Sequence, residues 1–224
     1  GLLNSGATFQ RLMDMVMSGL IFETCLVYLD DIVIFSRTWE EHLPRLEAVL
    51  KRILDTGLKL KPSKCKLLQR KVIFLGHVIT GDGVATDPSK TEEINRWPVP
   101  RSTKDVRSFL GLCGYYRRFI NQYAEIAFPM TSLLKKGVKF RWSETCQEAF
   151  EKLKAALTSP PILAMPRDEG TFFLDTDASD HSVGAVLSQM QDGQERVIAY
   201  AAKVLQPAQV KYCAYRRELL ATII

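Results

Sequence analysis

Two apolar runs enclose a pair of adjacent carboxylates near the N-terminus, and this pattern sets the strongest limit on the fold. Residues 25–27 and 32–35 are apolar, and Tyr28-Leu29-Asp30-Asp31 lies between them. An unpaired carboxylate is costly to bury, and two adjacent like charges raise that cost. The segment is therefore predicted to form a β-hairpin with Asp30 and Asp31 at its tip. Two explanations remain open for the tip: an ordinary exposed turn, or a site for a hard cation such as Mg²⁺.

Composition narrows the class of protein. The chain of 224 residues is 46% hydrophobic and 25% charged, which is typical of a globular protein with one large domain or two to three small ones. No apolar run approaches the ~20 residues that cross a bilayer, so no membrane association is expected. The five cysteines include no C-x-x-C pair, so neither a disulfide framework nor a zinc site is expected.

Hydrophobic periodicity predicts the order of elements. Apolar positions at helical spacing predict helices over about 7–18, between Thr38 and Gly57, after Ser102, between Ser143 and Ser159, and from about Tyr212 onwards. In the second of these helices the apolar face is predicted to comprise Leu43, Leu46, Leu50 and Ile53. A strand pair broken by Gly76 is predicted within 71–79, and a period of two predicts strands at 172–174, 184–189 and 196–200. These elements suggest three units, at 1–80, 81–165 and 166–224.

Basic residues are clustered although the net charge is only +5. The clusters are Lys59, Lys61, Lys64, Lys66, Arg70 and Lys71; Arg101, Lys104, Arg107, Arg117 and Arg118; and Lys135, Lys136, Lys139 and Arg141. Aromatic residues are interleaved with them, namely Trp97, Tyr115, Tyr116, Phe119 and Trp142. Solvated faces are the simplest explanation of one such run, but three runs with aromatic neighbours favour a nucleic-acid partner.

A second acidic group lies in the C-terminal part of the chain, where the spacing of apolar residues changes from that of a helix to a period of two. Asp175 and Asp177 lie two residues apart on a predicted strand, so both face the same way, ~6.6 Å apart. The small residues Ala178, Ser179, Gly184 and Ala185 allow another backbone to approach closely.

Seven segments together resemble a known family. Tyr28-Leu29-Asp30-Asp31 is similar to the Y-x-D-D motif of reverse transcriptases. The order of segments resembles the Pol polyproteins of gypsy-type LTR retrotransposons. The similar segments are 1–13 and 57–65 of the palm, the primer-grip hairpin at 74–79, the thumb segment at 109–120, and the ribonuclease H segments at 176–189 and 217–221.

The resemblance implies an α+β multidomain fold. It would contain the C-terminal part of a right-hand polymerase palm (1–80), a mostly helical thumb or connection (81–165) and the N-terminal part of a ribonuclease H-like α/β domain (166–224). The implied activities are RNA-directed DNA synthesis and cleavage of RNA in RNA–DNA hybrids. Both would use two Mg²⁺ ions, with Mn²⁺ as an alternative. The implied partners are primer–template, RNA–DNA hybrid and deoxynucleoside triphosphates.

The resemblance also implies roles for individual residues. The catalytic and metal-binding residues would be Asp30, Asp31, Asp177 and Glu218. The nucleic-acid-binding residues would be Phe9, Gln10, Tyr28, Lys64, Leu75, Gly76 and His77. Lys64 lies where a lysine protonates the pyrophosphate, although one more exposed lysine in a basic run is an equal alternative.

Some expected residues are absent. The family has a further palm aspartate, expected upstream of Gly1, and a later ribonuclease H carboxylate, expected beyond Ile224. We therefore expect an internal fragment with no polymerase activity, and little or no nuclease activity, of its own. Gly6 stands where the family has proline, which puts template positioning in question. A degenerate or co-opted nucleic-acid-binding remnant and a non-catalytic subunit of a polymerase dimer are the alternatives. Virus-like particles in the cytoplasm are the expected location, with the nucleus as a second one.

Overall fold

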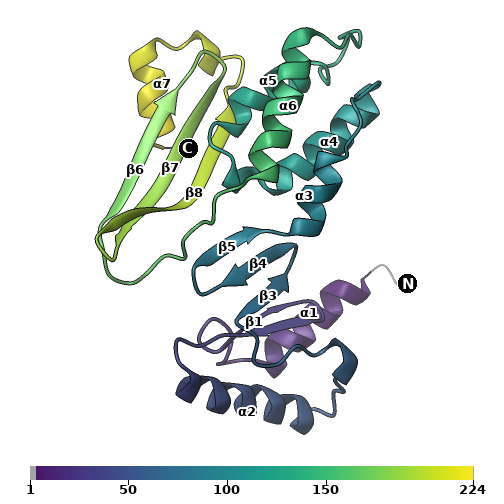
Figure 1. Ribbon diagram of the computed structural model, residues 1–224, viewed down its shortest axis with the longest axis vertical. Helices are drawn as coiled ribbons and strands as arrows, with labels where there is room; N and C mark the ends of the chain where they lie inside the picture. The colour runs from purple at the N-terminus through teal and green to yellow at the C-terminus, as the bar shows by residue number, and fades with distance from the viewer. Residues whose placement is uncertain (1–3, 224) are drawn as a thin grey trace. The chain divides into compact units, whose positions relative to one another are not determined.

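The computed structural model describes residues 4–223, and the chain divides into two compact units. The first ends at Gln69 and the second begins at Arg70. Each unit combines helices with antiparallel strands, so the α+β architecture is confirmed (Figure 1). Among residues 4–223, the helices lack the combination of length and apolar character that a membrane crossing requires.

The first unit is built around the predicted hairpin. It contains α1 (Ser5–Val16), β1 (Cys25–Tyr28), β2 (Asp31–Ile34), α2 (Trp39–Asp55) and the short η1 (Pro62–Lys64). β1 and β2 pair antiparallel, with Tyr28 opposite Asp31, which confirms the hairpin. A two-stranded hairpin is marginally stable alone, so its apolar side chains need the two helices. The resulting core comprises Met13, Val16, Met17, Cys25, Val49 and Ile53.

The start and end of α2 follow the sequence signals, but its buried face differs from the predicted one. The Thr38 side chain accepts a hydrogen bond from the Glu41 N–H, and Gly57 follows the helix with a positive φ of 72°. Leu43 and Leu50 are 47% and 38% exposed, whereas Val49 and Ile53 are buried. The predicted face was wrong in part, because one helix and a two-stranded hairpin cover only a narrow stripe of α2.

The second unit begins with a three-stranded antiparallel sheet of β3 (Lys71–Phe74), β4 (His77–Thr80) and β5 (Gly83–Thr86). The predicted break at Gly76 is confirmed, but β5 was not predicted, because it is only four residues long and begins with glycine. Val84 and Leu163 exchange backbone hydrogen bonds of 2.8 and 2.9 Å. A Cβ on Gly83 would lie 2.2 Å from the Leu163 carbonyl oxygen, so this close approach requires glycine.

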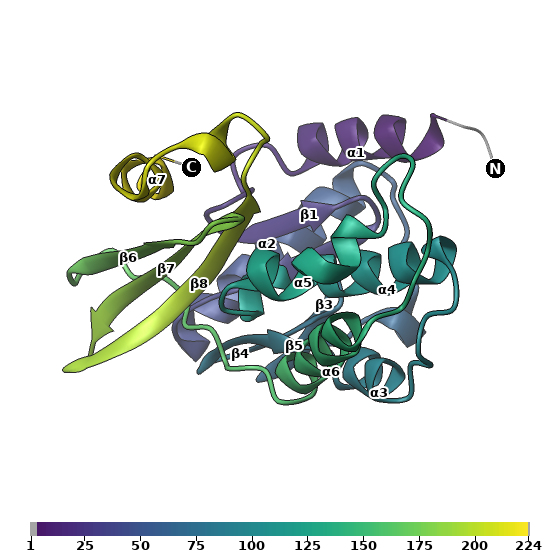
Figure 2. The same cartoon turned by 90° about the horizontal axis from the view of Figure 1, so that it is seen from above.

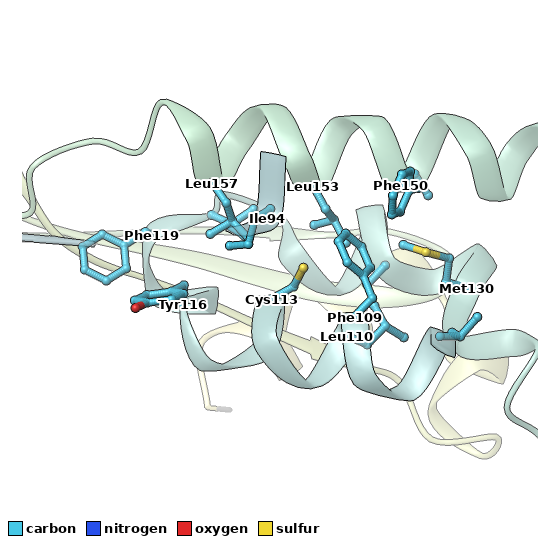
Figure 3. Close-up of a cluster of buried hydrophobic side chains, with 14 of the residues drawn as sticks. Ile94, Phe109, Leu110, Cys113, Tyr116, Phe119, Met130, Phe150, Leu153 and Leu157 are labelled. Atoms are coloured by element: carbon cyan, nitrogen blue, oxygen red, sulfur yellow. The ribbon is translucent and has the colours of Figure 1, made fainter. Parts of the chain in front are cut away.

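Helices form the centre of the second unit. They are α3 (Pro88–Asn95), α4 (Thr103–Tyr115), η2 (Arg117–Phe119), α5 (Tyr123–Ser132) and α6 (Glu144–Thr158). The predicted helices that became α4 and α6 are confirmed, and their apolar faces meet. Figure 3 shows Phe150, Leu153 and Leu157 of α6 facing residues of α4 such as Phe109 and Cys113. α3 and α5 were not predicted; α5 is short and contains Pro129.

The last part of the second unit is a three-stranded antiparallel sheet. It contains β6 (Phe172–Ala178), β7 (Ser182–Gln191) and β8 (Gln194–Val204), followed by η3 (Gln209–Lys211) and α7 (Ala214–Ala221). The predicted strands are confirmed, and β6, β7 and β8 each extend beyond the predicted ranges. One face of the sheet contributes Tyr200 to the helical core, and the other packs Ala178 and Val183 against α7. Figure 2 shows α7 over this sheet.

Candidate functional site

The tip of the first hairpin carries the two adjacent carboxylates. Asp30 and Asp31 are both exposed, and Leu29 before them has a left-handed φ of 53°. The Leu29 N–H donates a hydrogen bond to Oε1 of Gln10 on α1. α1 also approaches the tip at Gly6, where an added Cβ would lie 3.6 Å from Leu29 Cδ2. The tip is thus held from α1 while its carboxylates face solvent.

Three residues predicted to bind nucleic acid surround this tip. Tyr28 is 52% exposed, as a contact with a primer end would require. Phe9 is half-buried against the core of the first unit. The Gln10 amide has internal partners at both ends, because Nε2 also donates to Asp14 Oδ1 at 2.8 Å. Their contacts with nucleic acid stay a prediction.

The donor set at the tip suits Mg²⁺ in kind. Mg²⁺ is commonly held by one or two carboxylates, with the remaining positions filled by water and substrate phosphates. Asp30 and Asp31 supply two such carboxylates in an exposed position. Within residues 4–223, no group of three or more histidine, cysteine, aspartate or glutamate side chains lies close enough to hold a metal ion together. The tip therefore suits a Mg²⁺ ion whose remaining coordination positions are filled by water and by the phosphates of the substrate.

The lysines that follow α2 are available to a polyanion. Lys59, Lys61, Lys64 and Lys66 are all exposed, and Lys64 ends η1. Exposed lysines bind phosphates electrostatically, with an affinity that falls as salt rises. The structure does not distinguish a specific role of Lys64 from that of its neighbours.

Most of the aromatic residues interleaved with the basic clusters lie in the core. Tyr116 and Phe119 are 1% and 2% exposed, and Trp97 and Trp142 pack against the same cluster. The interpretation of these aromatic residues as a sign of nucleic-acid contact was wrong for Tyr116 and Phe119, because both rings are buried in the helical core. Tyr115 differs, since it is 52% exposed.

The turn between β3 and β4 is held by hydroxyl groups. Leu75 and Gly76 both have left-handed φ values, of 47° and 68°. The Tyr115 hydroxyl donates to the Leu75 carbonyl, and the Tyr116 hydroxyl donates to the Gly76 carbonyl at 2.7 Å. The Asp87 N–H donates to the Gly76 carbonyl as well, at 3.2 Å. Sequence patterns did not reveal these contacts, which join residues 40 positions apart.

The ring of His77 lies inside this aromatic group. It stacks on Tyr115 with centroids 5.4 Å apart and on Phe119 at 5.6 Å, and it meets Tyr116 edge-on. Its Nδ1 atom is buried without a hydrogen-bond partner. Burial, and then the charge of Arg118, lower the pKa of His77 below its usual value. Its imidazole is therefore engaged within the protein, and nucleic-acid binding by His77 stays a prediction.

Asp177 on β6 is engaged by the start of α5. Its Oδ2 accepts a hydrogen bond of 3.1 Å from Gln122 Nε2. Close by, Glu125 Oε2 accepts from the hydroxyls of Ser179 and Ser182, at 2.5 and 2.7 Å. These five residues, with Val183 and Gly184, line a small polar pocket. Gln122 and Glu125 were not singled out in the sequence, because neither belongs to a recognised motif.

Asp177 and Glu218 have different surroundings. Asp177 pairs with Gly184, and the next pair, Ala178 with Val183, faces the opposite side of the sheet. α7 packs on that opposite side, through Leu220 and Ala221, and carries Glu218 in an exposed position. The predicted metal-binding pair thus lies on elements associated with opposite faces, and its role stays a prediction. Within α7, Arg217 instead donates to the Ser179 carbonyl and to Asp180 Oδ1.

Two family models match the chain and define its class. Residues 1–79 match "Reverse transcriptase (RNA-dependent DNA polymerase)", and residues 142–224 match "RNase H-like domain found in reverse transcriptase". The chain is therefore a reverse transcriptase segment joined to an RNase H-like segment, as its sequence predicted.

The curated relatives make the family more specific. The chain is 45% identical over 224 residues to the "Retrovirus-related Pol polyprotein from transposon 297" of Drosophila melanogaster, and 36% identical over 235 residues to that from transposon gypsy of the same organism. All of this chain is covered in both, but only 21% and 22% of the relatives. The chain belongs to the gypsy-type retrotransposon Pol polyproteins and spans about a fifth of their length.

Solved structures are similar over nearly the whole chain. The "foamy viral protease-reverse transcriptase dRH in complex with ds DNA" has a TM-score of 0.86 at 28% identity, covering 99% of this chain and 39% of that one. The foamy viral protease-reverse transcriptase "in complex with RNA/DNA hybrid" has a TM-score of 0.82 at 28% identity, covering 100% and 30%.

Proposed function

We propose that this chain is the part of an RNA-directed DNA polymerase that presents two carboxylates to the reacting phosphates and holds the primer–template. The observation that carries the proposal is the hairpin tip with Asp30 and Asp31 adjacent, exposed and held from α1. The family match over residues 1–79 and the nucleic-acid complexes of the similar structures support it.

Each part of the first unit has a role in this proposal. Asp30 and Asp31 hold Mg²⁺, and Gln10 keeps the tip in shape by binding the Leu29 N–H. Mg²⁺ held by these carboxylates would supply activation of the primer hydroxyl, which attacks the α-phosphate of a deoxynucleotide, and stabilisation of the pyrophosphate that leaves. Tyr28 lies beside the carboxylates on an exposed surface, where it supports the primer end. The exposed lysines at 59–66 attract the phosphates of the template, the primer and the nucleotide.

Two carboxylates alone hold two metal ions poorly, so we expect metal and nucleic-acid binding from this chain without template-dependent synthesis. The test measures Mn²⁺ binding by electron paramagnetic resonance, with primer–template and a deoxynucleotide present. The doubly substituted Asp30→Asn, Asp31→Asn chain should lose binding by at least about tenfold. Asp82→Asn is the matched control, since Asp82 is also exposed in a hairpin turn. Equal Mn²⁺ binding by all three chains would overturn the proposal.

A second candidate function concerns the RNase H-like segment. A hybrid-cleaving nuclease needs several carboxylates around one metal site, whereas here Asp177 and Glu218 lie on elements associated with opposite faces of the sheet. This observation favours a segment that binds nucleic acid without cleaving it. A labelled RNA–DNA hybrid should then be bound but left intact in Mg²⁺. Rapid cleavage that Asp177→Asn abolishes would establish the nuclease instead.

A further inference from the structure

The Leu75-Gly76 turn has a backbone conformation that needs external support. Both residues have left-handed φ values, and for leucine this conformation is sterically unfavourable, because Cβ lies too close to the following carbonyl oxygen. Such a conformation persists where surrounding contacts determine it. In this chain the contacts come from the end of α4, a helix remote in sequence from the turn.

Two neighbouring tyrosines supply the contacts in a complementary way. The Tyr115 and Tyr116 hydroxyls bind consecutive carbonyls, those of Leu75 and Gly76. A Cβ on Gly76 would lie 3.3 Å from the Tyr116 hydroxyl oxygen and 3.5 Å from Tyr115 Cε1, so both rings reach the turn itself. The two rings meet edge-on at 5.0 Å, which restricts the position of each.

The tyrosines are themselves fixed in different ways. Tyr116 is 1% exposed and belongs to the helical core, together with Phe119. Tyr115 stacks on the His77 ring at an interplanar angle of 9° and keeps about half of its surface exposed. The turn is therefore connected to the core through Tyr116, and Tyr115 extends the same support to the surface.

We infer that Tyr115 and Tyr116 are positioning residues for the primer. Their hydroxyls fix the Leu75-Gly76 turn, and the turn in this fixed conformation holds the primer end. The inference rests on the proposed function, in which the chain holds a primer, and on the resemblance, which implies that the hairpin at 74–79 contacts that primer; the role of the two hydroxyls is the new part. The hydroxyls act through the backbone of the turn and need no contact with nucleic acid.

The test separates primer position from overall affinity. A primer with 4-thiothymidine at its 3′ end is bound to the chain with its template and irradiated, and the crosslinked peptide is mapped; fluorescence anisotropy of the same duplex gives Kd. Tyr115→Phe and Tyr116→Phe each remove one hydroxyl and keep the ring. The matched control is Tyr123→Phe, because the Tyr123 hydroxyl donates to the Leu110 carbonyl, away from the turn.

The original chain should crosslink within residues 74–78. Each of the two variants should lower that crosslink about fivefold, the factor expected for loss of one hydrogen bond, while Kd changes less than about twofold. Tyr123→Phe should change neither quantity. Undiminished crosslinks at 74–78 in both variants would overturn the inference, as would an equal decrease in Tyr123→Phe. Absence of that crosslink from the original chain, with the duplex bound, would instead reject the proposed primer placement.

A second measurement needs no nucleic acid. Amide hydrogen exchange at Gly76 and His77 should be faster in Tyr115→Phe and Tyr116→Phe, and unchanged in Tyr123→Phe. Unchanged exchange in the first two variants would show that the hydroxyls do not hold the turn, whatever the crosslinks give.

Discussion

Two hairpin tips in this chain present a left-handed leucine, and they are held in contrasting ways. Leu29 has a φ of 53° and is contacted by one amide, from Gln10. Leu75 has a φ of 47°, and its turn is bound by two tyrosine hydroxyls and a backbone N–H. The first tip carries the carboxylates proposed to bind metal. The comparison predicts that the proposed metal-binding tip is more adjustable than the proposed primer turn, because fewer contacts hold it.

The cores of the two units explain this difference. The first unit buries a small cluster between two helices and a two-stranded hairpin. The second unit has a large aromatic and aliphatic cluster that extends from α4 and α6 to Tyr116 and Phe119, beside the turn (Figure 3). A side chain fixed in such a core can hold a turn rigidly, and a half-exposed glutamine holds a tip less strongly.

The largest expected effect tests the link between the turn and the core. Tyr116→Ala removes a buried ring and a hydroxyl, and it should lower the free energy of unfolding by about 3–5 kcal/mol. Tyr215→Ala is the control, because Tyr215 is 73% exposed in the same unit and should change stability by less than about 0.5 kcal/mol. Chemical denaturation followed by tryptophan fluorescence measures both. Similar values for the two variants would contradict the comparison.

A smaller effect is expected at the glycine of the rigid turn. Gly76 and Gly193 have φ values of 68° and 76°, so alanine is strained by about 1–2 kcal/mol at either position. An added Cβ would have tyrosine atoms within 4 Å at Gly76, and no atom within 4 Å at Gly193. Gly76→Ala should therefore destabilise the chain by about 1 kcal/mol more than Gly193→Ala in urea denaturation. Equal losses would show that the tyrosines can move without cost.

The adjustable tip should respond more weakly. Gln10→Ala removes the acceptor of the Leu29 N–H and should cost about 1 kcal/mol of stability in the first unit. Amide exchange at Leu29 should accelerate about fivefold. Gln69→Ala is the control, because the Gln69 amide donates a hydrogen bond to the carbonyl of Leu67, which is close to it in sequence. Slow exchange at Leu29 in Gln10→Ala would mean that the first tip is as rigid as the second.

The smallest effect concerns pH. The pKa of His77 is lowered in the folded chain, first by burial and then by Arg118, so the folded state favours the neutral ring. Below about pH 6.5 the unfolded chain binds the proton more readily at this position. Stability should therefore fall as pH decreases from about 6.5 through the lowered pKa. His77→Phe should reduce this slope in denaturation curves collected between pH 5 and 8. An unchanged slope would remove His77 as its cause.

Local patterns predicted much of the fold and the position of the first tip. Helical spacing identified the faces of α4 and α6, and alternation identified β6 to β8. Two apolar runs around Asp30 and Asp31 identified the first hairpin. α3 and α5 were missed, since both are short and α5 contains a proline. The three-domain boundaries stay predictions, and the described chain shows a division between residues 69 and 70.

The sequence alone determined which residues are acidic, apolar or turn-forming, and adjacency along the chain was enough to place Asp30 beside Asp31. Tertiary structure decided which side chains meet across long separations. It placed the Tyr116 hydroxyl on the Gly76 carbonyl, and the Gln122 amide on Asp177. Hydrophobic periodicity reports which face of an element is buried but not which polar atom it meets, because that depends on how whole elements pack.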